Sequence, residues 1–505
     1  MSPHALNPLI LSLVTFVPAL GALFLVFFPR RDSSIRSFAL IIALVDFILS
    51  LHLPIYFDNA KPGFQFDVNI PWISSPNIHY HLGVDGISLW LVVLTTFLVP
   101  LGVLVSWKSV HDRVKEFFIL FLLLETAMIG VFVSLDLFFF YFFWEASLIP
   151  MALLIGMYGH ERRVYAAVKF FLFTMVASVF MLAAIIWLYA QTGSFDYLVI
   201  QQALRTEQIA NITTAGEWLF LGFFVAFAVK VPLFPLHTWL PDAHVEAPTA
   251  GSVLLAGVLL KMGTYGLLRF NVGLFPAQSR EHAPWIVTLA IIGIIYGALV
   301  AMVQPNLKKL IAYSSVSHLG FVVLGIFTFT QAGVDGAVYQ MLSHGVSTGA
   351  LFMLAGMLYE RRHTYEITDF GGLATPMPVY ATFFLVITLS SVGLPMLNGF
   401  IGEFLVLSGA FRAKAIYGIL AASGVVWSAC YLFWMYQRVF FGTVKLDANR
   451  TVPDIDIRER IALWPTAVAA LIMGIAPPVW FASIDPAVRI ALGPLAQELG
   501  RLVGP

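Results

Sequence analysis

Residues 230–270 read KVPLFPLHTWLPDAHVEAPTAGSVLLAGVLLKMGTYGLLRF. The second half of this stretch is an apolar run of about 20 residues, the length that crosses the hydrocarbon core of a membrane. Lys261 stands inside that run, and Lys230 stands just before the prolines Pro232 and Pro235. An ionisable side chain in a membrane span is costly, so each lysine is a candidate for function.

The composition of the whole chain is that of a membrane protein. Of its 505 residues, 59% are hydrophobic and only 11% are charged, whereas a soluble domain carries about 25% charged residues. The 28 basic and 28 acidic residues cancel, which excludes nucleic-acid binding through bulk positive charge. The single cysteine, Cys430, excludes an intramolecular disulfide and a cysteine-ligated cluster held by this chain alone.

Apolar runs of about 20 residues recur along the chain and predict an all-α polytopic membrane protein. We expect about 14 transmembrane helices, near residues 8–29, 37–56, 84–106, 116–134, 136–156, 168–190, 217–240, 249–269, 284–304, 309–330, 335–360, 378–411, 415–437 and 461–483. The loops between them are too short for a soluble catalytic domain. The two longest, 57–83 and 191–216, are expected to form small caps.

Lysine and arginine residues fall more often in the loops on one side of this arrangement than on the other. Because basic loops stay in the cytoplasm, the richer side is the inner one. We therefore expect a multi-pass protein of a bacterial-type inner (cytoplasmic) membrane, with both termini on the outer (periplasmic) side.

Ionisable residues at similar depth fall in several different spans. The candidates for proton translocation are Glu145, Lys230, Lys261 and Glu403, with His318, His344 and His237 as relays. Amines, carboxylates and imidazoles in one layer can form a lateral chain of proton sites. The alternatives are structural ion pairs and, for any single histidine, a satisfied polar core residue. Haem ligation by His237 and His244 is disfavoured because Pro241 separates them at a helix end.

Two of the predicted spans contain helix breakers beside a buried charge. Pro232 and Pro235 follow Lys230, and Pro395 precedes Glu403. Interrupted spans are tolerated where the freed backbone groups line a polar cavity, although an ordinary proline kink is the alternative.

The two breaks are five helices apart, which suggests two inverted five-helix repeats. The expected organisation is an N-terminal three-helix segment (1–115), a first repeat (116–270), a second repeat (284–441), and a C-terminal helix and tail (442–505).

Four stretches of this sequence resemble a known family. They are FWEASLIP at 143–150, HTWLPDAHVEAPTAGSVLLAGVLLKMGTYGLLRF at 237–270, SSVSHLG at 314–320 and LPMLNGFIGEF at 394–404. Together they resemble the subunit M family, the antiporter-like, proton-translocating membrane subunits of the proton-pumping NADH–quinone oxidoreductase, respiratory complex I. The resemblance covers about 120–480. One departure is Met396, where the family leads us to expect a glycine.

The resemblance implies roles for the buried residues. Glu145 and Lys230 would be a channel pair, Lys261 the central site, His318 and His344 connecting groups, and Glu403 the terminal site. The chain itself would hold no cofactor, because flavin, iron–sulfur clusters and quinone belong to partner subunits. Its partners would be other membrane-arm subunits, including homologous antiporter-like subunits on either side, and lipids, but no nucleic acid. A subunit of a membrane-bound hydrogenase or formate-oxidising complex, an Mrp-type sodium/proton antiporter subunit and a purely structural scaffold are the alternatives.

Overall fold

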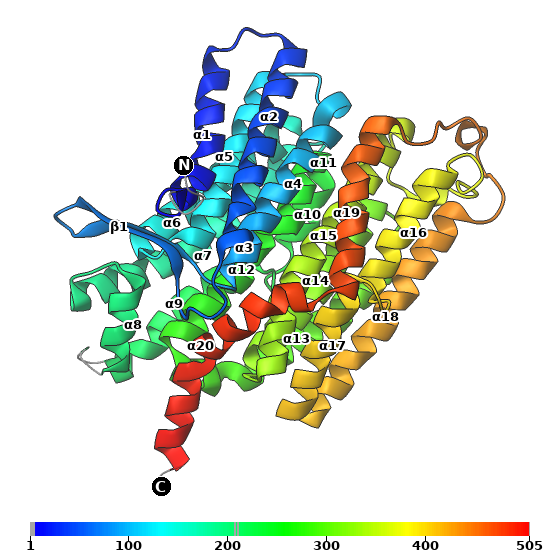
Figure 1. Cartoon of the computed structure of the whole chain (residues 1–505). Coiled ribbons are helices and arrows are strands. Elements are labelled where there is room, and N and C mark those ends of the chain that lie inside the picture. Colours follow the sequence, from blue (N-terminus) through cyan, green and yellow to red (C-terminus); the bar gives the residue numbers. More distant parts are fainter. Residues whose placement is uncertain (1–5, 207–208, 210–211, 504–505) are drawn as a thin grey trace.

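Three membrane-spanning helices precede the two units that the sequence predicts. The computed structural model describes residues 6–206, 209 and 212–503. The N-terminal helices are α1 (Ile10–Phe27), α2 (Asp32–Ser50), its short continuation α3 (His52–Tyr56) and α4 (Ser88–Ser109). In Figure 1 they lie beside α5 at one end of the molecule, far from α16 and α18.

The first unit ends in a span that is buried along its whole length. Its helices are α5 (Val114–Val133), α6 (Leu137–Tyr158), α7 (Arg163–Thr192), α9 (Ile212–Lys230), α10 (Trp239–Glu246), α11 (Thr249–Leu254), η2 (Leu255–Leu259), α12 (Leu260–Gly266) and η3 (Leu267–Val272). The segments from α11 to η3 form one continuous span. Its two π-helical segments, η2 and η3, flank Lys261 on both sides, and such segments are frequent at functional sites.

The second unit and the C-terminal helices complete the bundle. They are α13 (Pro276–Met302), α14 (Leu307–Phe327), α15 (Gln331–Arg362), α16 (Pro378–Val392), α17 (Asn398–Ala413), α18 (Ala415–Phe440), α19 (Ile457–Ile475) and α20 (Pro478–Val503), with 3₁₀ turns η4 (Ile367–Asp369) and η5 (Asp447–Asn449). The bend between α19 and α20 is 68°. Prolines at 477 and 478 explain it, because proline cannot continue a preceding helix.

The predicted number of about 14 spans is not confirmed. By length and composition, 11 of the described helices can cross a membrane, or 12 if α19 and α20 form one bent span. Two of the expected spans are interrupted at helix breakers. The helix expected near 378–411 is divided into pieces of 15 and 16 residues, and the one expected near 217–240 stops at Lys230.

Both expected interruptions are present, and polar contacts satisfy the backbone groups that they free. After α9 the chain turns through residues 231–238, where the indole Nε1 of Trp239 donates to the carbonyl of Val229 at 2.9 Å. After α16, Gly393 has φ of 82°, the left-handed conformation in which helices commonly end. The breaks coincide with the predicted breakers Pro232, Pro235 and Pro395.

The expected cap at 57–83 forms a two-stranded hairpin on a protein that is otherwise mostly helical, as the predicted all-α class requires. β1 (Gln65–Ile73) pairs antiparallel with β2 (Ile78–Val84). We call the side of the molecule that carries this hairpin the hairpin face.

Two further helices lie on the hairpin face where the sequence predicts a loop and a tail. The segment 191–216 contains α8 (Tyr197–Arg205); its residues 207–208 and 210–211 lie outside the described residues, as do 1–5 and 504–505 of the terminal segments. In Figure 1, α20 runs across this face toward α8.

One backbone feature occurs at the same position in both units. Asp136, at the start of α6, forms a bridge with Asp196 after α7, and Asn306, at the start of α14, forms one with Glu366 after α15. We call these bridges the two clamps. The first clamp is on the hairpin face, and α13 crosses the bundle before the second, which therefore lies on the opposite face. Matching clamps on opposite faces are what two inverted repeats require.

Met396 lies in the second interruption, with φ of 75°. This left-handed backbone costs a non-glycine residue about 1–2 kcal/mol, and the side chain is 64% exposed, so little packing depends on it. We expect Met396→Gly to keep or raise thermal stability, the greater freedom of the unfolded chain offsetting part of the gain. Met396→Val should lower it, because β-branched residues rarely adopt this backbone. Thermal unfolding of the detergent-solubilised assembly measures both, and a lower Tm for the glycine variant than for the valine variant would contradict this explanation.

Candidate functional site

Lys261 lies in the middle of its span and is fully buried. Its amine donates a hydrogen bond to the carbonyl of Ala256, and Nζ lies 2.7 Å from Nδ1 of His344 in α15. Among the described residues no carboxylate interacts with this amine. A proton on Lys261 is therefore held by an imidazole and a carbonyl, without a counter-ion.

Two glycines let α15 approach closely enough for this contact. A Cβ on Gly345 would lie 2.9 Å from the carbonyl oxygen of Gly257 and 2.6 Å from the side chain of Leu94. Small residues let membrane helices approach backbone to backbone. The position of His344 beside Lys261 thus depends on the residue that follows it in sequence.

His318 and Glu403 form a second buried contact. Nδ1 of His318 lies 2.8 Å from Oε1 of Glu403, and Gln340 donates to the same oxygen at 3.1 Å. Space for the carboxylate comes from the break in the neighbouring helix, because a Cβ on Gly393 would lie 3.3 Å from Oε2 of Glu403. On its other side His318 meets the hydroxyl of Tyr431, 3.4 Å from Nε2.

The two contacts join into one row of ionisable side chains. The ring centres of His344 and His318 are 5.8 Å apart, so the order along the row is Lys261, His344, His318 and Glu403. We call these four residues the buried row. Neither in this row nor elsewhere in the described chain are three His, Cys, Asp or Glu side chains grouped so as to hold a metal ion.

Lys230 and Glu145 do not form the direct pair that the sequence suggests. Lys230 is the last residue of α9, and its Nζ has no hydrogen-bond partner in the described chain. Nζ instead faces the rings of Trp144 at 5.3 Å and Phe170 at 5.6 Å. Glu145 is only half-buried and interacts with Lys230 through its charge, without an ion-pair contact. Trp144 occupies the place next to the amine.

His237 lies apart from the buried row, in the turn after α9. Its ring is surrounded by the aromatic rings of Phe234, Tyr296 and Tyr313, and its Nδ1 is buried with no partner among the described groups. This environment suits a packed histidine as well as a relay, and the contacts of the ring favour neither.

His244 and Lys308 are buried residues that sequence reasoning missed as site candidates. The ring of His244 stacks on Phe352 with centres 4.4 Å apart, and neither ring nitrogen has a partner within the described part of the chain. Its charged neighbours are Lys308 and Lys261. Lys308 donates to the carbonyl of Ala247 at 2.5 Å. His244 lies in the same stretch, 237–270, as Lys261. This shared motif was the sequence signal that could have identified His244 as a site candidate.

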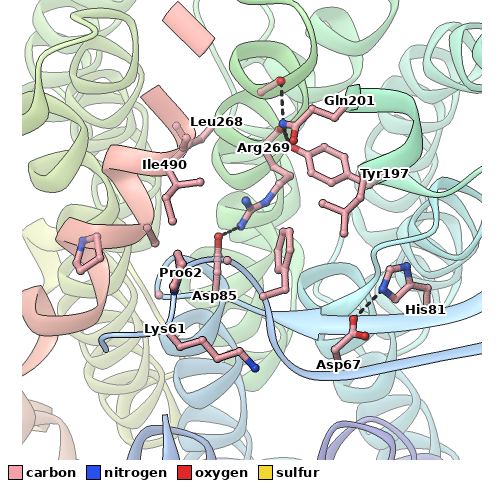
Figure 2. Close-up of a pocket in the computed structure, with 18 of the residues that line it drawn as sticks. Lys61, Pro62, Asp67, His81, Asp85, Tyr197, Gln201, Leu268, Arg269 and Ile490 are labelled. Atoms are coloured by element: carbon pink, nitrogen blue, oxygen red, sulfur yellow. Dashed lines mark hydrogen bonds and ion pairs between the residues drawn. The ribbon is translucent and has the colours of Figure 1, made fainter. Parts of the chain in front are cut away.

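A cavity of about 670 Å³ opens on the hairpin face (Figure 2). Its walls come from the hairpin, α8, η3 and α20. At its base Nη2 of Arg269 lies 2.6 Å from Oδ2 of Asp85, and both side chains are buried. Figure 2 shows Arg269 and Asp85 directed toward one another, and Lys61 and Asp67, which also line the cavity, are exposed.

His81 connects three segments at the wall of this cavity. Its Nδ1 lies 2.5 Å from Asp196, before α8, and its Nε2 lies 2.8 Å from Asp67 in β1. Ionised carboxylates only accept hydrogen bonds, so a protonated imidazole, in which both ring nitrogens donate, matches these two partners. Burial alone would lower the pKa of His81, but the two carboxylates outweigh burial and raise this pKa above its ordinary value.

These features define a polytopic helical membrane protein with interrupted spans and a row of ionisable groups through its interior. The family profile described as "NADH:quinone oxidoreductase/Mrp antiporter, TM" matches residues 134–428, and "NADH-ubiquinone oxidoreductase chain 4, amino terminus" matches residues 13–133. The chain belongs to this family of membrane subunits, and the resemblance found in the sequence is confirmed.

Individual relatives agree with this assignment. "NADH-quinone oxidoreductase subunit M" of Rhodobacter capsulatus is 46% identical over 507 residues, covering 98% of each chain. "NADH-ubiquinone oxidoreductase chain 4" of Arabidopsis thaliana is 44% identical, covering 93% of this chain and 94% of that one. A chain of "Respiratory complex I from Thermus thermophilus with bound NADH" has a TM-score of 0.87 and 34% identity, covering 96% of this chain and 99% of that one.

The close approach of α15 to η2 can be tested with two glycines on one helix. We expect Gly345→Ala to separate Lys261 from His344 and to destabilise the protein by about 1–3 kcal/mol, as overpacking of a full core does. Gly349→Ala is the matched control, because its Cβ would meet its nearest neighbour at 3.5 Å, an ordinary contact. Thermal unfolding and quinone reductase activity of the assembled complex measure the effect, and equal behaviour of the two variants would show that the approach is not limiting.

We expect the contacts of His81 with Asp196 and Asp67 to attach the hairpin to the rest of the protein more tightly at low pH. Because the pKa of His81 is raised, its stabilising charge is present in full below the ordinary value of about 6.5 and is lost as the pH rises through the raised value. Hydrogen–deuterium exchange of β1 and β2, corrected for intrinsic rates, should therefore accelerate over that range. The His81→Gln variant should exchange faster at low pH and lack the step. A step of the same size in this variant would assign the pH dependence to another group.

Proposed function

We propose that this chain is a proton-translocating membrane-arm subunit of an NADH:quinone oxidoreductase and carries no redox centre of its own. The observation that supports the proposal is the buried row, in which Lys261, His344, His318 and Glu403 follow one another through the interior. Flavin, iron–sulfur clusters and quinone would belong to partner subunits. Those partners would include homologous antiporter-like subunits on either side, together with membrane lipids.

The row has a direction, because its two ends differ in charge. Among the described residues a protonated Lys261 has no anion beside it, whereas a protonated His318 would lie against the carboxylate of Glu403. Two opposite charges about 4 Å apart attract by roughly 4 kcal/mol at an effective dielectric constant of 20. This attraction exceeds the roughly 2.3 kcal/mol that one charge gains or loses across 100 mV. A proton given up by Lys261 is therefore drawn toward Glu403.

The Lys230 and Glu145 region would supply protons to this row. Lys230 lies at the C-terminal end of α9, where the helix dipole favours a cation, and the rings of Trp144 and Phe170 face its amine. Contact with Glu145 requires Trp144 to move aside. We propose that this side chain decides whether the Glu145–Lys230 pair is closed or open, with His237 relaying protons beyond the break.

The two five-helix units, 116–270 and 284–441, would be inverted repeats. Their clamps support this proposal because they join equivalent positions on opposite faces. With the hairpin face directed outward, both termini lie on the outer side of a bacterial-type inner membrane, as the basic residues suggest.

An Mrp-type antiporter subunit, or a subunit of a hydrogenase or formate-oxidising complex, is the second candidate. A chain of "Structure of Mrp complex from Dietzia sp. DQ12-45-1b" shares the fold at a TM-score of 0.82, with 23% identity. Identification of the subunits that co-purify with this chain decides between the candidates. An NADH-oxidising flavin module supports the proposal, whereas a nickel hydrogenase or an isolated antiporter complex contradicts it.

The terminal role of Glu403 is tested by three substitutions. Glu403→Gln keeps the shape but cannot release a proton, so we expect it to abolish proton pumping. Glu403→Asp should keep a fraction of the activity, and Glu403→Lys should impair it by placing a cation beside His318. Vesicles containing assembled complex allow the proton-to-electron ratio and the quinone reductase rate to be measured together.

The control for this series is Asp447→Asn, because the carboxylate of Asp447 is almost wholly exposed. It should pump like the parent. Parental pumping by Glu403→Gln at a matched level of assembly would make Glu403 a structural residue and place the terminal site elsewhere.

A further inference from the structure

The base of the cavity on the hairpin face lies above Lys261 in the same span. Arg269 and Asp85 meet there, with side chains only 8% and 9% exposed. Arg269 follows Lys261 by eight residues, which corresponds to about 12 Å along a helix. An opening at Arg269 would thus bring water to within two helical turns of the central lysine.

Tyr265 is the residue between these two levels. It is one turn from Lys261 and one turn from Arg269, and it is buried. The Nε–H of Arg269 donates to the Tyr265 hydroxyl at 3.3 Å, and that hydroxyl donates to the carbonyl of Phe132 at 3.4 Å. Asp85, Arg269 and Tyr265 therefore form a chain of contacts between the cavity and the level of Lys261.

The ion pair is fixed on both sides. The carboxylate of Asp85 also accepts hydrogen bonds from the amides of Ile87 and Ser88, both at 3.1 Å, at the start of α4. The guanidinium of Arg269 lies over the rings of Phe64 at 4.9 Å and Tyr265 at 5.3 Å. A buried pair of this kind brings little net stability, so stability alone is a weak explanation for it.

We infer that Arg269, held by Asp85 and Tyr265, is a closed gate that insulates the buried row from water on the hairpin face. Arginine keeps its proton at every physiological pH, so it cannot relay one. Paired with Asp85, it closes the opening with a group that neither accepts nor passes on a proton. The inference rests on the proposed function, since only a chain that moves protons through Lys261 needs this insulation.

An open gate would let protons leak back through the protein but would not stop quinone reduction. Protons accumulated outside would return through the cavity to Lys261, driven by the membrane potential. Quinone reduction would continue, while the gradient that it builds would decay.

The experiment measures this decay in vesicles containing the assembled complex, after NADH is exhausted. We expect Arg269→Gln to speed the loss of the pH gradient several-fold while quinone reductase activity is retained. The double variant Arg269→Gln/Lys261→Ala should return the decay to the parental rate, because the leak passes through Lys261. Arg205→Gln, at an exposed position lining the same cavity, is the matched control and should not leak.

A second variant keeps the test decisive if Arg269→Gln does not assemble. Tyr265→Phe preserves the ring and removes only the hydroxyl, and it should also leak in a manner that Lys261→Ala suppresses. Parental decay in both Arg269→Gln and Tyr265→Phe would overturn the gate, as would a leak that persists without Lys261. Undiminished pumping by Lys261→Ala alone would instead overturn the proposed function, so the two failures are distinguishable.

Discussion

The amine of Lys261 and the imidazole of His344 lie 2.7 Å apart in a part of the protein that is closed to solvent. Among the described residues no carboxylate lies beside either group, so a proton held there is poorly stabilised. Several features of the surrounding structure make that contact between Lys261 and His344 possible. Gly257 and Gly345 let the helices approach, the π-helical segments adjust the span around the lysine, and apolar side chains exclude water.

The two interrupted spans hold charged side chains away from water while the helix bundle stays intact. Lys230 lies at the end of α9, and Glu403 lies against the break that precedes α17. A continuous helix would fill the same space with backbone and Cβ atoms. Each break thus provides both the room and the partial charges that an ionisable side chain needs.

The sequence was sufficient for features with a local cause and insufficient for features that depend on distant partners. Membrane helices, the interruptions at Pro232 and Pro395, and the buried ionisable residues follow from hydrophobicity and proline chemistry over a few residues. The hairpin was not predicted because its hydrophobic and polar residues alternate only weakly. Its many polar side chains are also typical of a loop. Lys230 was expected against Glu145, yet its amine faces the rings of Trp144 and Phe170. The Arg269–Asp85 ion pair joins residues that are far apart in the chain, so no local sequence pattern predicts it.

The cavity on the hairpin face is assembled from both ends of the chain. Phe64 and Asp85 belong to its first hundred residues, whereas Ser483 and Ile490 belong to α20. The indole of Trp90 donates to the hydroxyl of Ser483 at 2.8 Å, so the start of α4 is fastened to a residue 393 positions further along the chain. During synthesis this face therefore stays open until α20 has followed the other helices. The walls of the cavity meet only at that stage, so the hairpin face is completed after the helices that lie beneath it.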